Sequence, residues 1–185
     1  MYIALSMVIG KLSNQGGKMI PEITLKNYIE LAVATEENGA KFYQKLAKKF
    51  ANNEDVSDLF TRLAKDEAIH KAKFLELLND LPEEGISLAP ERAQYVKAMS
   101  TSKFFSRKRG PFKDIDKIIN RDDALETAFS FEKATLGFYQ AVRDFFVGDS
   151  KVLIKVIEAE KEHVVKIMGV MMTGAKFRGL ENDWS

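Results

Sequence analysis

Apolar residues recur at three- and four-residue intervals in four long stretches of the chain, with charged residues between them. This spacing predicts amphipathic α-helices, each with one face toward a common core. We expect helices over about residues 24–50, 55–78, 122–146 and 150–172. Thr24 is the expected N-cap of the first helix, and Lys48 and Lys49 complement the negative end of its dipole. Gly174 is expected to end the fourth helix.

The connections between these helices predict their arrangement. A short turn at residues 51–53 joins the first two helices and another at 148–149 joins the last two, so each pair forms an antiparallel hairpin. Residues 79–121 form a much longer connection, which holds three of the chain's four prolines. Structureless connections of this length are uncommon in compact domains, so we expect short helices at about 91–99 and 114–119. The pattern therefore predicts an all-α, antiparallel four-helix bundle with one long crossover connection.

Length and composition limit what the protein can be. At 185 residues the chain is long enough for one well-filled core, and we expect a single domain over residues 21–185 after an extension at 1–20. The chain is 45% hydrophobic and 30% charged with a formal net charge of +1, so no electrostatic reason favours nucleic acid or a membrane surface as a partner. The absence of cysteine excludes disulfides, zinc–thiolate sites, iron–sulfur clusters and a cysteine nucleophile.

Two segments outside the predicted helices leave alternatives open. The apolar stretch from Met1 to Ile9 is too short to span a bilayer and lacks the features of a secretory signal, so we expect a cytoplasmic protein. Residues 103–113 are basic with interleaved aromatics. They fit either a docking patch for an acidic redox partner or another subunit, or a solvated loop whose phenylalanines pack under the bundle. Short basic runs are weak motifs, so we favour the loop.

The candidate chemistry lies in a motif that occurs twice. The chain has two histidines, His70 and His163, and each follows a glutamate by three residues, Glu67 and Glu160 respectively. Residues three apart share a helix face, so each motif projects a carboxylate and an imidazole in one direction, among apolar core positions. Burying these groups is costly unless they bind something, and Glu-x-x-His is a metal-binding motif of helical bundles. One such pair alone is more often a surface pair, but its repetition favours ligands.

The helices before these motifs also repeat each other. Glu36 precedes a Phe-Tyr pair that ends at Tyr43, and Glu132 precedes one that ends at Tyr139 by the same interval. Each of these glutamates lies about fourteen residues before its turn, and each Glu-x-x-His glutamate lies about twelve to fourteen residues after it, which is roughly 20 Å along the helix in every case. Antiparallel packing therefore predicts that the glutamates and histidines of all four helices lie at one level.

Four carboxylates and two imidazoles at one level indicate a pair of metal ions. Four ionised glutamates in an apolar core would repel one another, whereas two divalent cations balance four negative charges. Oxygen-rich ligation with one imidazole per ion suits iron or manganese, with cobalt and zinc as substitutes. The hydroxyls of Tyr43 and Tyr139 are placed to hold carboxylates, although a core tyrosine often has a packing role alone. Small residues beside the ligands leave room for the ions and a diatomic substrate: Ala32, Gly39, Ala40 and Ala64.

The candidate ligands and the two Phe-Tyr pairs resemble those of the ferritin-like di-iron carboxylate proteins, and most closely those of the rubrerythrin-related group. The ligands are Glu36, Glu67, His70, Glu132, Glu160 and His163, and the resemblance covers about residues 24–174. It implies a ferritin-like bundle whose di-iron centre reduces hydrogen peroxide or dioxygen with electrons from a separate donor such as a rubredoxin. It also implies one histidine per iron, with Glu36 and Glu160 as terminal or flexible ligands and Glu67 and Glu132 as bridges.

Two departures from that family change what the resemblance implies. Rubrerythrins usually carry a cysteine-ligated rubredoxin module, which a chain without cysteine cannot contain. They also have a further glutamate three residues after the third-helix ligand, where this chain has Thr135, and this leaves a six-ligand site similar to that of bacterioferritin. A ferroxidase or iron-handling protein is therefore one alternative, and a non-enzymatic helical interaction module stabilised by metal is another. Because few residues follow Met172, we expect a homodimer rather than a storage cage.

Overall fold

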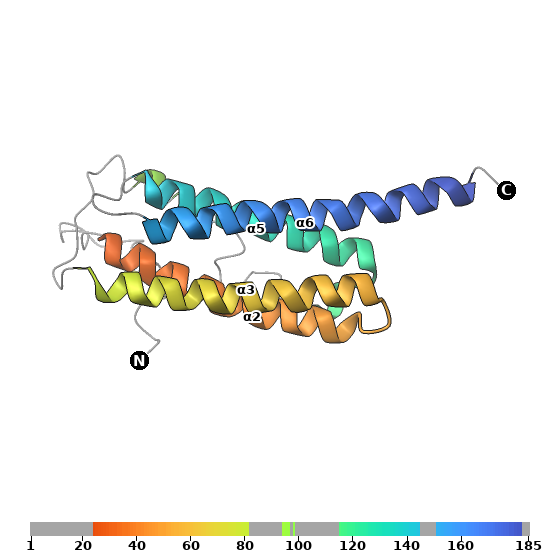
Figure 1. Ribbon diagram of the computed structural model, residues 1–185, viewed down its shortest axis with the longest axis horizontal. Coiled ribbons are helices and arrows are strands. Elements are labelled where there is room, and N and C mark those ends of the chain that lie inside the picture. Colours follow the sequence, from red (N-terminus) through yellow and green to blue (C-terminus); the bar gives the residue numbers. More distant parts are fainter. Residues whose placement is uncertain (1–23, 82–93, 97, 99–114, 145–150, 183–185) are drawn as a thin grey trace, which may run out of the picture.

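The computed structural model describes residues 24–81, 94–96, 98, 115–144 and 151–182, with side chains up to residue 173. This part of the chain contains no strand and confirms the predicted all-α fold (Figure 1). Its long helices are α2 (Leu25–Lys49), α3 (Glu54–Asn79), α5 (Arg121–Arg143) and α6 (Lys151–Asn182), together with the short 3₁₀ helix η3 (Ile115–Lys117).

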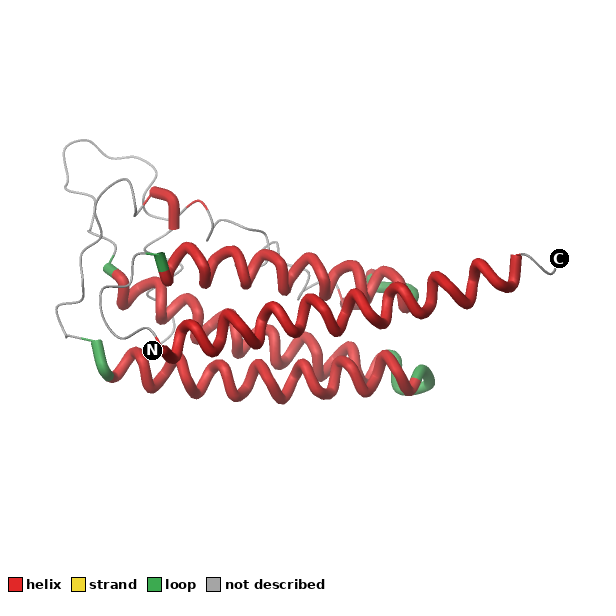
Figure 2. Tube along the Cα trace, turned by 45° about the horizontal axis from the view of Figure 1, so that its top comes forward, coloured by secondary structure: helices red, strands yellow, loops and turns green. Residues whose placement is uncertain are grey.

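The four long helices form a bundle of two antiparallel hairpins. Helices α2 and α3 make one hairpin and α5 and α6 make the other, and both views show the two hairpins packed along their length (Figures 1 and 2). Helix α3 packs on α6, and α2 packs on α5. Helix α3 ends at the opposite end of the bundle from the start of α5 (Figure 1), so the connection between them must traverse the molecule. The predicted single-crossover topology is confirmed.

The core consists of two apolar clusters toward the two ends of the bundle. One contains residues from the start of α2 and the end of α5, including Tyr139, which packs 4.8 Å from Phe74 between ring centroids. The other contains residues from the end of α2 and the start of α3, including Tyr43, which stacks 5.8 Å from Phe60. Burying each large apolar side chain contributes about 1.5–3 kcal/mol, which helps to offset the cost of the polar layer that lies between the clusters.

Side-chain caps and one lysine fix the ends of the helices. The backbone N–H of Thr24 donates to Asn27 Oδ1 at 3.0 Å, which agrees with the predicted start of α2. Asn53 and Asn120 cap α3 and α5 by accepting backbone N–H groups at 3.2 Å and 2.8 Å. Lys49 Nζ donates to the carbonyl of Ile115 at 2.9 Å, which ties the crossover to the end of α2. The short helix predicted at 114–119 is therefore present as the 3₁₀ turn η3.

The predicted end of the fourth helix is wrong. Helix α6 continues through Gly174 and Gly179 to Asn182, and Figure 1 shows its last turns extending beyond the other helices. A glycine inside a helix costs only about 1 kcal/mol relative to alanine. Gly174 lies within a helix of 32 residues and is followed directly by Ala175, the best helix former, so this cost does not end the helix.

Other predictions fall partly or wholly outside the described residues. The extension at 1–20, the basic stretch at 103–113 and positions 145–146 of the predicted third helix lie there, whereas α5 itself ends at Arg143 with Asp144 as its C-cap. Of the short helix predicted at 91–99, residues 94–96 and 98 are described and are helical. In the described helices, no stretch is both long enough and apolar enough to cross a membrane.

Candidate metal centre

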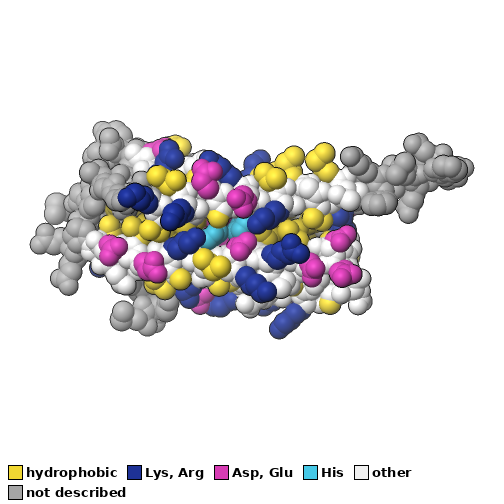
Figure 3. Space-filling model, viewed as in Figure 1, with side chains coloured by type: hydrophobic (Ala, Val, Ile, Leu, Met, Phe, Trp, Pro, Cys, Tyr) yellow, Lys and Arg dark blue, Asp and Glu magenta, His cyan; other side chains and the backbone are white. Residues whose placement is uncertain are grey.

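All six predicted ligands lie together in the middle of the bundle, and none is more than 2% exposed. Helix α2 contributes one glutamate, α5 contributes one, and α3 and α6 each contribute a Glu-x-x-His motif. They are Glu36, Glu67, His70, Glu132, Glu160 and His163. The structure therefore agrees with the predicted common level of these side chains. On the face of the molecule shown in Figure 3, small areas of histidine are visible among charged residues.

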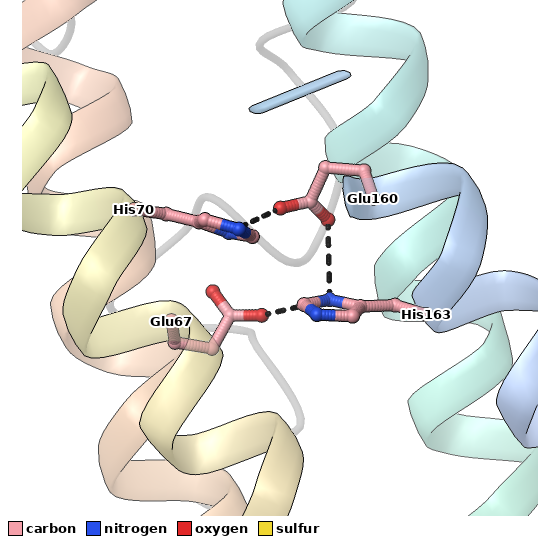
Figure 4. Close-up of side chains that lie close together, drawn as sticks. All are labelled: Glu67, His70, Glu160 and His163. Carbon is pink, nitrogen blue, oxygen red and sulfur yellow. Dashed lines mark ion pairs between the residues drawn. The ribbon is translucent and has the colours of Figure 1, made fainter. Parts of the chain in front are cut away.

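The rings of the two histidines are stacked, with their centroids 5.3 Å apart. Nδ1 of His70 lies 2.8 Å from Glu160 Oε1 and 3.5 Å from Glu36 Oε2. One ligand atom from each of Glu67, His70, Glu160 and His163 falls within 4.8 Å of all the others (Figure 4). Such a group of oxygen and nitrogen atoms is compact enough to bind a metal ion.

The surroundings of His163 are similar but not identical. Its Nδ1 lies 3.4 Å from Glu132 Oε2, 3.6 Å from Glu67 Oε1 and 3.8 Å from Glu160 Oε2. Glu160 thus directs one oxygen toward each histidine, whereas Glu132 is near only one of them. This differs from the division that the family resemblance implied, in which Glu132 bridges and Glu160 is terminal or flexible. The reason is that α3 and α6 pack against each other, so Glu160 on α6 lies between His70 on α3 and His163 on its own helix.

Unpartnered atoms in this cluster provide a test of whether metal ions fit. Eight buried carboxylate and imidazole atoms make no hydrogen bond within the described part of the chain, including both oxygens of Glu67 and of Glu160 and Nδ1 of both histidines. Buried polar groups are costly when unpaired, and a cluster of them aimed at one point is the environment that cations stabilise. Four carboxylates with two imidazoles fit two hard or borderline divalent ions such as iron or manganese.

The protonation of the metal-free centre reflects the same shortage of positive charge. Burial and the charges of the other carboxylates raise the pKa of Glu67 and of Glu160 well above the usual value. Burial opposes the charged forms of His163 and Glu132 as well, but the attraction between these two groups, whose charged atoms lie 3.4 Å apart, outweighs it. The pKa of His163 is therefore raised and that of Glu132 is lowered. Without metal, protons thus supply the positive charge that cations would bring.

The two tyrosines singled out in the sequence hold the carboxylates that come from the opposite hairpin. The hydroxyl of Tyr43 on α2 donates to Glu132 on α5, and that of Tyr139 on α5 donates to Glu36 on α2. Both tyrosines are fully buried. Burial and the nearby carboxylate charges raise the pKa of both phenols well above the usual value, so they remain protonated donors. Each hairpin thus donates one tyrosine hydrogen bond to the other, and these two bonds fix one oxygen of Glu132 and one of Glu36.

Gly39 provides space beside the centre. A Cβ at this position would lie 3.0 Å from Glu67 Oε2 and 3.1 Å from Phe131 Cε1, which is closer than such atoms normally approach. The glycine therefore allows the Glu67 carboxylate to lie directly against the backbone of α2. Gly39 is one of the small residues expected to leave room for the ions and a diatomic substrate, and in the structure the Glu67 carboxylate lies beside it.

Two further residues complete the surroundings of the ligands. Asp66 Oδ2 lies 3.3 Å from Nε2 of His163, a contact that sequence reasoning missed. Its signal was the spacing of four residues from Asp66 to His70, which places both on one face of α3. Thr135 is fully buried and its hydroxyl donates to the carbonyl of Phe131 at 3.0 Å. This position therefore supplies no carboxylate to the centre.

Comparisons with known proteins agree with this arrangement. The family model described as rubrerythrin matches residues 27–171. A crystal structure of a protein described as a candidate ferritin-like diiron-carboxylate protein from Thermotoga maritima superimposes with a TM-score of 0.64 and 24% identity. The match covers 80% of this chain and 94% of that one, and at this identity it shows the fold alone. No curated protein matches the chain at a significant level.

Proposed function

Because the chain belongs to the rubrerythrin family, we propose that it is a di-iron carboxylate oxidoreductase that reduces hydrogen peroxide or dioxygen to water. The observation that carries the proposal is the cluster of eight buried, unpartnered ligand atoms from four helices, aimed at one point. A bundle stabilised only by packing would gain by replacing these groups with apolar ones. Their retention at the centre of the core is explained by bound metal ions, and two iron ions would supply the redox chemistry.

The chain's own residues have distinct parts in this proposal. Glu36 with His70 and Glu132 with His163 would each hold one ion, and Glu160 would be shared because it faces both histidines. Tyr43 and Tyr139 keep the two outer carboxylates oriented by donating to them. The apolar clusters on either side exclude bulk water from the substrate. Electrons would come from a separate donor such as a rubredoxin, since the chain has no cysteine to ligate an iron–sulfur group.

Anaerobic stopped-flow absorbance tests the proposal. Protein loaded with two Fe(II) per chain is mixed with hydrogen peroxide or with dioxygen, and we expect rapid oxidation of the centre. Glu36→Gln should slow this oxidation by at least about tenfold, because it replaces a ligand. Glu37→Gln is the matched control, because Glu37 faces the surface lysines Lys41 and Lys71 at 2.5 Å and 3.2 Å. An unchanged absorbance of the wild-type protein with both oxidants would refute the proposed activity.

Ferroxidase activity is a second candidate, favoured by Thr135. Its hydroxyl is bonded to a backbone carbonyl and lies where rubrerythrins carry an additional carboxylate, so the centre retains a six-ligand set similar to that of bacterioferritin. A ferroxidase would oxidise many Fe(II) per chain when Fe(II) is in excess. The proposed peroxidase or oxidase would instead turn over with a reduced donor such as a rubredoxin. Size-exclusion chromatography adds a second criterion, since we expect a homodimer and a storage cage would elute far earlier.

A further inference from the structure

The outward-facing nitrogens of the two histidines have different surroundings. Nε2 of His163 lies 3.3 Å from Asp66 Oδ2, and Asp66, whose side chain is 34% exposed, also lies 3.7 Å from Lys166 Nζ. In the internal repeat, Asp66 precedes Glu67 as Ala159 precedes Glu160. Alanine has no polar atom to offer to His70. Among the described residues, the carboxylates that pair with His70 approach its Nδ1, from inside the centre.

The inner sides of the two histidines differ in the number of carboxylates nearby, while the single shortest contact, 2.8 Å, belongs to His70. Nδ1 of His163 has three carboxylates within 3.8 Å, whereas Nδ1 of His70 has two within 3.5 Å. The additional carboxylate near His163 is Glu67, whose other oxygen lies in the space that Gly39 leaves open. At the position equivalent to Gly39 the second half of the chain has Thr135, whose side chain is buried. The two halves of the repeat therefore build unequal environments from equivalent positions.

We propose that the centre consists of two unequal metal sites, and that the site of Glu132 and His163 binds its cation more tightly and fills first. This inference rests on the proposed di-metal function. Asp66 is the positioning residue responsible. By accepting the Nε2–H of His163, it fixes the tautomer whose Nδ1 lone pair points into the centre, orients the ring and increases its basicity. His70 has no such partner at Ala159, so the site of Glu36 and His70 fills second and exchanges its cation more readily.

Anaerobic equilibrium titration with Co(II), followed by its d–d absorbance in the presence of a competing chelator, tests the inference on the full chain. The wild-type protein should bind two ions in two resolved steps. Asp66→Ala should weaken the first step by about 10–100-fold, which is the usual effect of removing such a partner, and leave the second step unchanged. Asp66→Asn should restore part of the loss, because its amide oxygen can still accept from His163.

Two variants complete the design. Ala159→Asp supplies the missing carboxylate behind His70 and should tighten the second step. Asp58→Asn removes an exposed acid from the same helix as Asp66 and should change neither step, which controls for net charge. Far-UV circular dichroism of each variant reports whether it folds. If Asp66→Ala does not fold, the affinities of Asp66→Asn and the wild-type protein for the first ion test the inference instead.

The outcomes separate this inference from the proposed function. Two ions bound with indistinguishable affinities, or a first step that is insensitive to both Asp66 variants, would overturn the inference and leave the di-metal function standing. Fewer than two ions per chain would overturn the di-metal function itself, and the inference with it.

Discussion

Gly39 and Gly169 form a matched pair that tests how tightly the centre is packed. Both lie inside long helices, α2 and α6, so replacing either one with alanine should add about 1 kcal/mol of helix propensity. Their surroundings differ, since a Cβ at Gly39 would lie 3.0 Å from Glu67 Oε2, whereas one at Gly169 would meet nothing within 4 Å. The gain in helix propensity is therefore the same in both variants. The difference between their free energies of unfolding then measures the packing at the centre.

The size of the effect can be estimated from these contacts. Glu67 and Phe131, the neighbours of Gly39, are both fully buried and would have to shift by a few tenths of an ångström. Overpacking a filled core costs about 1–3 kcal/mol. We expect Gly169→Ala to raise the free energy of unfolding of the metal-free protein by about 1 kcal/mol. Gly39→Ala should have a free energy of unfolding about 1–3 kcal/mol lower than that of Gly169→Ala.

Urea denaturation followed by far-UV circular dichroism measures both variants. A second measurement, Co(II) affinity, should be lower in Gly39→Ala because the displaced carboxylate of Glu67 is a ligand, and it should be unchanged in Gly169→Ala. Equal unfolding free energies together with equal metal affinities would refute the argument. They would mean that Glu67 does not need the space beside Gly39.

Three further predictions concern protons and hydrogen bonds at the centre. Burial and neighbouring carboxylates raise the pKa of Glu67 and Glu160 above 4.5, so the folded metal-free protein keeps protons that the unfolded chain loses. Its free energy of unfolding, measured by urea titration, should therefore fall as the pH rises from about 4.5 toward neutrality, and a rise would contradict the raised pKa values. Binding of divalent ions should release protons, measured by calorimetry in buffers of different ionisation enthalpy, and no release would contradict the same assignment. Tyr139→Phe removes the donor to Glu36 and should cost about 1–3 kcal/mol in urea denaturation; an unchanged free energy of unfolding would argue against the hydroxyl's role.

The fold and the composition of the centre follow from short-range regularities, which is why the sequence predicts them. The three-residue spacing of Glu67 and His70 sets a common helix face whatever the tertiary structure. Two tight turns force antiparallel hairpins, and a rise of about 1.5 Å per residue then fixes the level of Glu36 and Glu132. These arguments need no knowledge of how one hairpin sits on the other.

The features that the sequence did not predict depend on that packing or on small energy differences. Which glutamate is shared depends on α3 facing α6, and this arrangement made Glu160 rather than Glu132 the residue near both histidines. The contact of Asp66 with His163 crosses between the same two helices. The end of α6 depends on whether Gly174 breaks the helix. A glycine in a helix costs only about 1 kcal/mol relative to alanine, and α6 continues through Gly174.

Anomalous X-ray scattering from crystals of the iron-loaded protein, recorded on both sides of the iron absorption edge, tests the central claim most directly. The account predicts two iron peaks in the middle of the bundle, one beside Glu36 and His70 and one beside Glu132 and His163, with Glu160 between them. A centre without iron peaks, or a single ion bound elsewhere on the molecule, would contradict it.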